Sequence, residues 1–175
     1  MDWRTVVVGV VGAVALGALP LRFGGDALAL ILFTAWFVVL VVGLATDLDQ
    51  RILSNLTTLP VIPVALLYDL SGRNPFVGGE LLPAIAAATI IPAALYLPSI
   101  PFGEGAFGIG DVKLLIGVGL MLGLARAFSG IVVGLFASGI VLAVLLVARR
   151  IGRRSYVPFG PFLILGAMWA VLVRT

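Results

Sequence analysis

Cysteine and histidine are both absent from the 175 residues of the chain. Without cysteine, the protein can form neither a disulfide framework nor a thiolate metal site. Without histidine, it lacks the commonest zinc ligand and the usual general base of enzymes. Any acid–base chemistry must therefore fall to carboxylates, and we expect no metal and no other cofactor.

Charged residues are scarce, at 11% of the chain, whereas 62% of the residues are hydrophobic and the mean hydropathy is +1.24. A soluble domain cannot hide this much apolar surface. The sequence therefore predicts an integral membrane protein whose partners include membrane lipids. The formal net charge of +3 does not indicate nucleic-acid binding, because the basic residues lie between apolar segments and form no patch interleaved with aromatic residues.

Apolar stretches follow one another along the chain, and a helix needs roughly 20 residues to cross a bilayer. Seven are present, at approximately residues 5–21, 27–46, 52–70, 81–100, 112–125, 128–148 and 159–173. The third holds polar residues and prolines and the fifth is short, so we expect both to be broken or shielded by neighbouring helices. The predicted fold class is all-α, a polytopic membrane bundle of about six or seven transmembrane helices. We expect one membrane domain over residues 1–175, with an extra N-terminal helix at 1–26 and a core at 27–175.

Basic residues fall unequally on the two sides of the membrane if every stretch crosses it. One side has seven of them, namely Arg4, Arg51, Lys113, Arg149, Arg150, Arg153 and Arg154. The other side has four, namely Arg22, Arg73, Arg126 and Arg174. The positive-inside rule places the first side in the cytoplasm. The sequence therefore predicts a multi-pass protein of the cell membrane with its N-terminus inside.

Two aspartates stand where apolar stretches meet short polar junctions: Asp47 ends the second stretch and Asp111 opens the fifth. Carboxylates at membrane depth are costly and usually functional. Because two crossings separate the junctions, both aspartates reach the same, cytoplasmic face. There they could form an aspartyl protease dyad, in which one ionised carboxyl activates water and the other carries a proton.

Simpler explanations exist for each aspartate. Asp47 could pair with Arg51, and Asp111 could be the N-terminal cap of a helix. Capping does not explain why Gly108 and Gly110 clear side chains from the backbone beside Asp111. A peptide substrate that approaches in extended form would need such clearance. We therefore expect these glycines to support the site or to admit the substrate.

Three segments carry a resemblance to a known family: ATDLDQRILSNLTTLP at 45–60, GIGDVKLLIGVGLMLG at 108–123 and VPFGPFLILGA at 157–167. They resemble, in order, the signature regions of the type IV prepilin peptidases, which are membrane aspartyl proteases with a GxGD motif. The resemblance implies that Asp47 and Asp111 are catalytic.

The remaining motif residues map onto supporting positions. In the family, the first aspartate precedes by seven residues a proline that is followed by Asn or Asp; here Ser54 replaces that proline and Asn55 follows it. Lys113 matches the lysine that follows GxGD, and Pro158 and Gly160 match the Pro-Phe-Gly-Pro signature. The serine makes the local turn the main departure from the family pattern.

The resemblance implies cleavage of short basic leader peptides from pilin-like precursor proteins at the cytoplasmic membrane face. Many bacterial members also have a cytoplasmic insert with paired cysteines that methylates the new N-terminus. Because this chain has no cysteine, it is more similar to the short, peptidase-only form, as in archaeal preflagellin and prepilin peptidases and the enzymes of Flp-type pili.

Two other functions remain open from the sequence. A small membrane transporter or scaffold could use Asp47 and Asp111 as an ion site, although we find no inverted repeat that would favour it. A presenilin-like protease would use the same dyad to cut within transmembrane helices. The spacing from Asp47 to Asn55 and the short fifth stretch favour the prepilin type.

Overall fold

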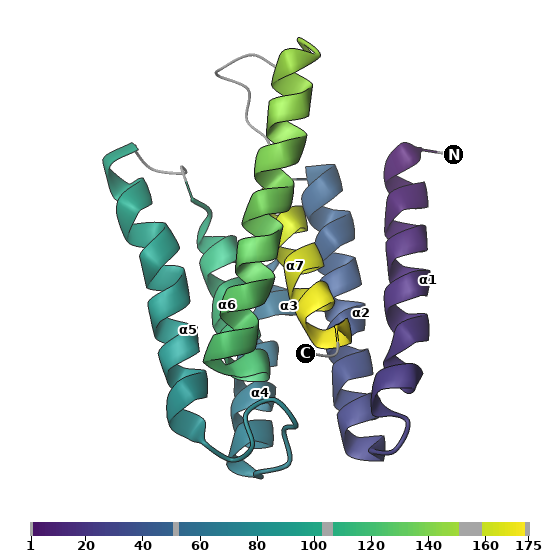
Figure 1. Cartoon of the computed structure of the whole chain (residues 1–175), viewed down its shortest axis with the longest axis vertical. Coiled ribbons are helices and arrows are strands. Elements are labelled where there is room, and N and C mark those ends of the chain that lie inside the picture. The colour runs from purple at the N-terminus through teal and green to yellow at the C-terminus, as the bar shows by residue number, and fades with distance from the viewer. Residues whose placement is uncertain (1, 51–52, 103–106, 151–158, 174–175) are drawn as a thin grey trace.

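The structure, a computed structural model, describes residues 2–50, 53–102, 107–150 and 159–173 (Figure 1). All regular secondary structure in these residues is helical, which confirms the predicted all-α class. The elements are α1 (Trp3–Phe23), α2 (Ala27–Gln50), α3 (Asn55–Thr58), α4 (Val61–Leu70), α5 (Leu81–Tyr96), the 3-10 helix η1 (Leu97–Phe102), α6 (Ile109–Val147) and α7 (Gly160–Leu172).

Several helices are long and apolar enough to cross a membrane. Four segments meet this description, namely Trp3–Phe23, Ala27–Gln50, Leu81–Pro101 and Ile109–Val147. Two shorter apolar segments, Asn55–Leu70 and Gly160–Leu172, pack among them. The chain is therefore a multi-pass membrane protein. The third apolar stretch is broken as predicted, because α3 ends at Thr58 and α4 begins at Val61.

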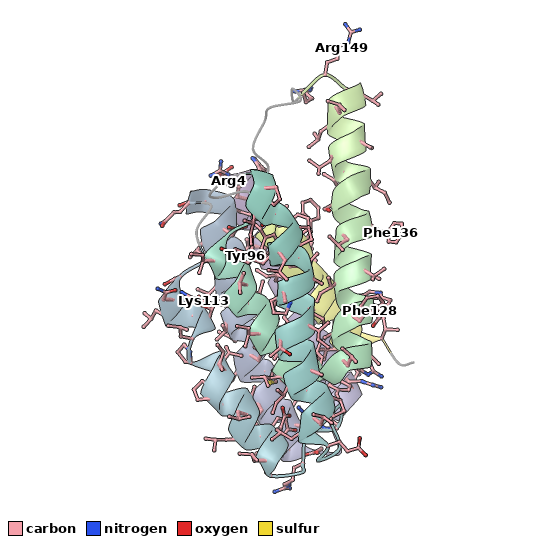
Figure 2. The ribbon with its side chains drawn as sticks, turned by 90° about the vertical axis from the view of Figure 1, so that its left-hand side faces the viewer. Arg4, Tyr96, Lys113, Phe128, Phe136 and Arg149 are labelled. Atoms are coloured by element: carbon pink, nitrogen blue, oxygen red, sulfur yellow. The ribbon has the colours of Figure 1, made fainter. Side chains whose placement is uncertain are left out.

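Helix α6 turns back on itself at Gly123, where φ is 65° and ψ is 178°. Glycine adopts a positive φ without the steric cost that other residues pay. The first arm, residues 109–122, leads down to this turn, and the second arm, residues 124–147, returns beside it (Figure 1). The two arms correspond to the fifth and sixth predicted stretches, with the turn slightly earlier than expected. The second arm carries Phe128 and Phe136 on its outer side and ends near Arg149 (Figure 2).

The helices form two halves that meet along the middle of the molecule. In one half α2 packs against α1 and α7, and in the other α4 and α5 pack against α6. Aromatic side chains join the halves at the end of the bundle that holds the turn of α6. The Phe33 ring of α2 lies 6.3 Å from the Tyr68 ring of α4 and 5.3 Å from the Phe76 ring of the following loop, measured between centroids.

A buried hydrogen-bond cluster fastens the α4–α5 loop to the turn of α6. The Asn74 amide donates to Asp69 Oδ1 at 2.7 Å and to the Met121 carbonyl at 3.1 Å. Its own oxygen accepts from the Phe76 backbone N–H at 3.0 Å. Asp69 and Asn74 are each only 1% exposed. Because burial leaves water unavailable to these groups, the bonds hold the loop in one place.

Glycines allow the helix backbones to approach closely. A Cβ on Gly119 would lie 2.5 Å from the Ala88 nitrogen of α5, and one on Gly130 would lie 2.7 Å from the Gly166 carbonyl oxygen of α7. Gly134 faces the Phe162 carbonyl in the same way, at 2.5 Å. Small residues at such crossings are typical of membrane helices, which associate through close packing. The first arm of α6 thus packs closely against α5, and the second arm packs closely against α7.

We predict that Gly119→Ala lowers the free energy of unfolding by about 1–3 kcal/mol, because the methyl group would overlap the α5 backbone. Gly139→Ala is the matched control, since a Cβ at Gly139 meets nothing within 4 Å. The control should change stability by no more than about 1 kcal/mol, in the stabilising direction, because alanine favours helix over glycine. Thermal unfolding of the purified proteins in detergent makes the comparison. Equal unfolding temperatures would contradict the packing described for Gly119.

Candidate active site

Asp47 lies in the last turn of α2 and is 6% exposed. It follows Gly43 by four residues, so both lie on the same face of the helix. That face points toward α7 and the segment before α3, because a Cβ on Gly43 would meet Ile164 and Leu53, each at 3.5 Å. The helix therefore directs Asp47 into the protein and away from lipid.

Asp111 lies in the first turn of α6, and the residue before the helix is Gly108 in an extended conformation, with φ −70° and ψ 137°. The carboxyl group bends back over this residue: a Cβ on Gly108 would lie 3.3 Å from Asp111 Oδ2. An acidic side chain in the first turn is favoured by the unpaired N–H groups of a helix N-terminus. The unpaired N–H groups at the start of α6 therefore favour an aspartate at position 111.

The two carboxyl groups converge on Gly160, the first residue of α7. A Cβ on Gly160 would lie 2.7 Å from Asp47 Oδ2 and 3.2 Å from Asp111 Oδ1. Both distances start from one point, so the two carboxyl groups lie within a few ångströms of each other and interact electrostatically. The structure therefore brings together the two predicted aspartates from α2 and α6, and it adds the start of α7 as the backbone between them.

A pair of adjacent carboxyl groups can perform acid–base chemistry without a metal. When one is ionised and the other protonated, the first can activate a water molecule and the second can donate a proton to a carbonyl oxygen. In the part of the chain that the structure describes, no cluster of three or more His, Cys, Asp or Glu residues could hold a metal ion. The proximity of the two carboxyl groups suits hydrolysis by an aspartyl dyad.

Lys113 and Asn55, two of the predicted supporting residues, form a hydrogen bond. The Lys113 ammonium donates to Asn55 Oδ1 at 2.6 Å, joining residues 58 positions apart. The bond ties the start of α6 to the start of α3. Lys113 thereby helps to place the turn of helix that carries Asp111.

Ser54, which stands where the family pattern has proline, caps α3. Its hydroxyl accepts from the Leu56 N–H at 3.2 Å, and its carbonyl accepts from the hydroxyls of Thr57 and Thr58 at 2.8 and 3.1 Å. Its φ of −68° lies within the range that a proline ring imposes. The backbone angle at Ser54 is therefore one that proline could also adopt. The serine differs from proline in adding the side-chain hydrogen bond of an N-cap.

Gly110 faces another part of the same chain. A Cβ at this position would lie 2.9 Å from the Leu53 Cβ and 3.3 Å from the Leu53 carbonyl oxygen. The missing side chain lets the segment before α3 lie against the start of α6, which is a structural reason for glycine. That this glycine also admits a substrate backbone stays a prediction.

Three other residues considered from the sequence are not part of the described pair of carboxyl groups. Asp49 is exposed, and its Oδ1 lies 3.2 Å from Nη1 of Arg4 on α1. Pro158 and Arg51 lie outside the described residues. The sequence did not point to Leu53, which lies against both Gly43 and Gly110. The spacing of four residues from Gly43 to Asp47 was the available signal for that face of α2.

Comparisons with known proteins give one family. The model of the type IV leader peptidase family matches residues 31–147 of the chain. The prepilin leader peptidase/N-methyltransferase of Aeromonas salmonicida is 30% identical over 160 residues, which cover 89% of this chain and 52% of that protein. The protein of the same name from Burkholderia pseudomallei is 33% identical over 158 residues, covering 89% of this chain and 50% of that protein. The chain thus spans about half the length of these relatives. No solved structure matches it.

Proposed function

The chain belongs to the type IV leader peptidase family, and from this premise we propose that it is an aspartic endopeptidase that removes basic leader peptides from pilin-like precursors. One observation carries the proposal: Asp47 and Asp111, from separate helices, converge on the backbone of Gly160. The names of the similar proteins describe prepilin leader peptidases, which supports the substrate class. Neither a transporter nor a presenilin-like protease is favoured by these comparisons.

The reaction follows from what a peptide bond requires. An ionised carboxylate removes a proton from water, whose oxygen then attacks the scissile carbonyl carbon. The protonated partner donates its proton to the carbonyl oxygen, where negative charge would otherwise accumulate. Collapse of the tetrahedral intermediate breaks the C–N bond, and the amine leaves with a proton from the dyad. Asp47 and Asp111 supply both roles, and no cofactor takes part.

The dyad is proposed to face the cytoplasm. Two basic residues lie close to the dyad: Arg4 pairs with Asp49, two residues after Asp47, and Lys113 follows Asp111 by two residues. Arg149 lies above Arg4, beyond the upper end of the bundle (Figure 2). Arg22 and Arg126 lie at the other end, where both guanidinium groups approach the Phe76 ring. The sequence assigns seven basic residues to the side of the dyad and four to the other side, so the positive-inside rule favours the cytoplasm for the dyad.

We predict that Asp47→Asn and Asp111→Asn each reduce cleavage of a pilin-like precursor by about 10²-fold or more, because each removes a proton-transfer role. Asp49→Asn is the control, since it alters only an exposed ion pair with Arg4 and should retain most activity. Processing is measured in membranes by the change in precursor mass, with immunoblotting to confirm equal insertion. Normal cleavage by either dyad variant would refute the assignment.

Gly160→Ala should reduce cleavage about 10²-fold, because the methyl group would force the two carboxyl groups from their positions and misplacement by about 1 Å is enough for such a loss. Gly139→Ala, in open space on α6, serves as the matched glycine-to-alanine control. The rate constant for precursor cleavage is compared for both variants at equal protein amount. If Gly160→Ala cleaves at the rate of the control, the carboxyl groups do not act at this position.

The orientation is tested with single cysteines, for which the chain has no competing thiol. Cysteine at Ser71, on the α4–α5 loop, should react with an impermeant maleimide on intact cells. Cysteine at Gln50, at the end of α2, should react only after the membrane is opened, because it lies on the dyad side. The reverse labelling pattern would place the dyad outside the cytoplasm while leaving the dyad chemistry untouched.

A further inference from the structure

A pocket of about 410 Å³ lies at the end of the bundle opposite the dyad. The end of α1, the α1–α2 loop, the α4–α5 loop and the second arm of α6 surround it, and these segments lie toward the lower end of the molecule (Figure 1). Three charged residues line the pocket, namely Arg22, Asp26 and Arg126. The dyad chemistry uses none of them, and the volume is in the range of small-ligand sites.

Aromatic side chains fix one wall of the pocket. The Phe76 ring packs edge-on against the rings of Phe23 and Phe33, with centroids 5.9 and 5.3 Å away. Phe23 also stacks on Phe33 at 4.7 Å. The backbone N–H of Phe76 donates to the buried Asn74 side chain. The wall is therefore in place before a ligand arrives, which lowers the entropy cost of binding.

Two guanidinium groups of the same charge lie at this wall. The Cζ atoms of Arg22 and Arg126 are 5.8 and 4.5 Å from the centroid of the Phe76 ring. Nη1 of Arg126 donates to the carbonyls of Ala170 and Val173 at 2.8 and 3.1 Å, which holds this side chain at the end of α7. Arg22 is half-buried, yet within the described residues it donates no hydrogen bond and joins no ion pair. Two cations placed together in this way favour an anion at the pocket.

Asp26 restricts the kind of anion. It lines the same pocket, and its Oδ1 accepts from the Ala29 N–H at 3.0 Å at the start of α2. This carboxylate would repel a small, strongly charged anion such as inorganic phosphate. A phosphodiester has a single negative charge and continues into a headgroup, whose hydroxyl or amine groups can donate to the carboxylate. The charges of the pocket therefore favour a lipid headgroup over a free phosphate ion.

The pocket also borders the surface that faces lipid. Arg22 lies in the last turn of the membrane-crossing helix Trp3–Phe23, and Arg126 comes just after the turn of α6. Apolar residues beside both arginines are exposed: Leu21 is 77% exposed, and Phe128, on the outer side of α6 in Figure 2, is 61% exposed. Cationic side chains near the ends of membrane helices reach the headgroups, whereas their apolar neighbours contact acyl chains.

We propose that this pocket binds the headgroup of one phospholipid from the leaflet opposite the dyad. The phosphodiester lies between Arg22 and Arg126, and the polar end of the headgroup reaches Asp26. Helix α1 packs mainly on α2 and α7, so the bound lipid adds a link from α1 to the second arm of α6. The site is separate from the dyad, and its test needs no precursor.

The first test measures lipid binding to the full chain, purified in detergent and freed of residual lipid, by native mass spectrometry. The probes are phosphatidylglycerol, diacylglycerol with the same acyl chains, and inorganic phosphate. One phosphatidylglycerol should bind about tenfold or more tightly than diacylglycerol, because hydrogen bonds between charged groups contribute about that factor. Equal affinities for the two lipids would overturn the proposal, since apolar contacts alone would explain them. Displacement of the lipid by an equal concentration of inorganic phosphate would overturn the lipid as the source of the phosphate.

The same measurement on variants locates the site. Arg22→Gln should weaken phosphatidylglycerol binding about tenfold, because it removes one charged contact to the phosphate. Arg73→Gln is the matched control: it removes the same charge from the exposed α4–α5 loop without changing the lining of the pocket, and its affinity should stay within about twofold of the unmodified protein. Arg126 is left intact because it also holds the end of α7. Equal affinities for the two variants would refute the site.

A second measurement covers the case in which Arg22→Gln is less stable by itself. Added phosphatidylglycerol should raise the thermal unfolding temperature of the unmodified protein and of Arg73→Gln, because a ligand that binds the folded state stabilises it. Arg22→Gln should show about half of this increase or less, whatever its unfolding temperature without lipid. The same increase in all three proteins would overturn the proposal.

Discussion

The close approach of two carboxyl groups to the backbone of Gly160 is the contact on which the rest of the site depends. It requires that the end of α2, the start of α6 and the start of α7 meet within a few ångströms. Any side chain on α7 at that point would occupy the space of the carboxyl oxygens. The end of α2 and the starts of α6 and α7 therefore have to lie at the same level of the bundle.

Helix α6 positions both Asp111 and, through its contacts with α7, Gly160. Its first arm carries Asp111 and rests on α5 through Gly119. Its second arm holds α7 through close backbone contacts at Gly130 and Gly134, and α7 begins with Gly160. Because both arms start from the turn at Gly123, a shift at that turn would move Asp111 and Gly160 together. The buried bonds of Asn74 next to the turn stabilise this common origin.

The sequence predicted the helices better than the contacts between them. Hydrophobicity and length are enough to find the apolar stretches, and the number of crossings between Asp47 and Asp111 places them on one face. A membrane helix is apolar all round, so its pattern does not show which face meets which neighbour. The contact of Gly110 with Leu53 and the bond from Lys113 to Asn55 join distant segments and were therefore not predictable from local spacing.

The position of Gly160 late in the chain also bears on biosynthesis. Asp47 and Asp111 enter the membrane during translation well before α7, which supplies the backbone between them. A partly made chain therefore holds both acidic side chains but not the frame that aligns them. The two carboxyl groups therefore reach their described arrangement only after α7 has joined the bundle.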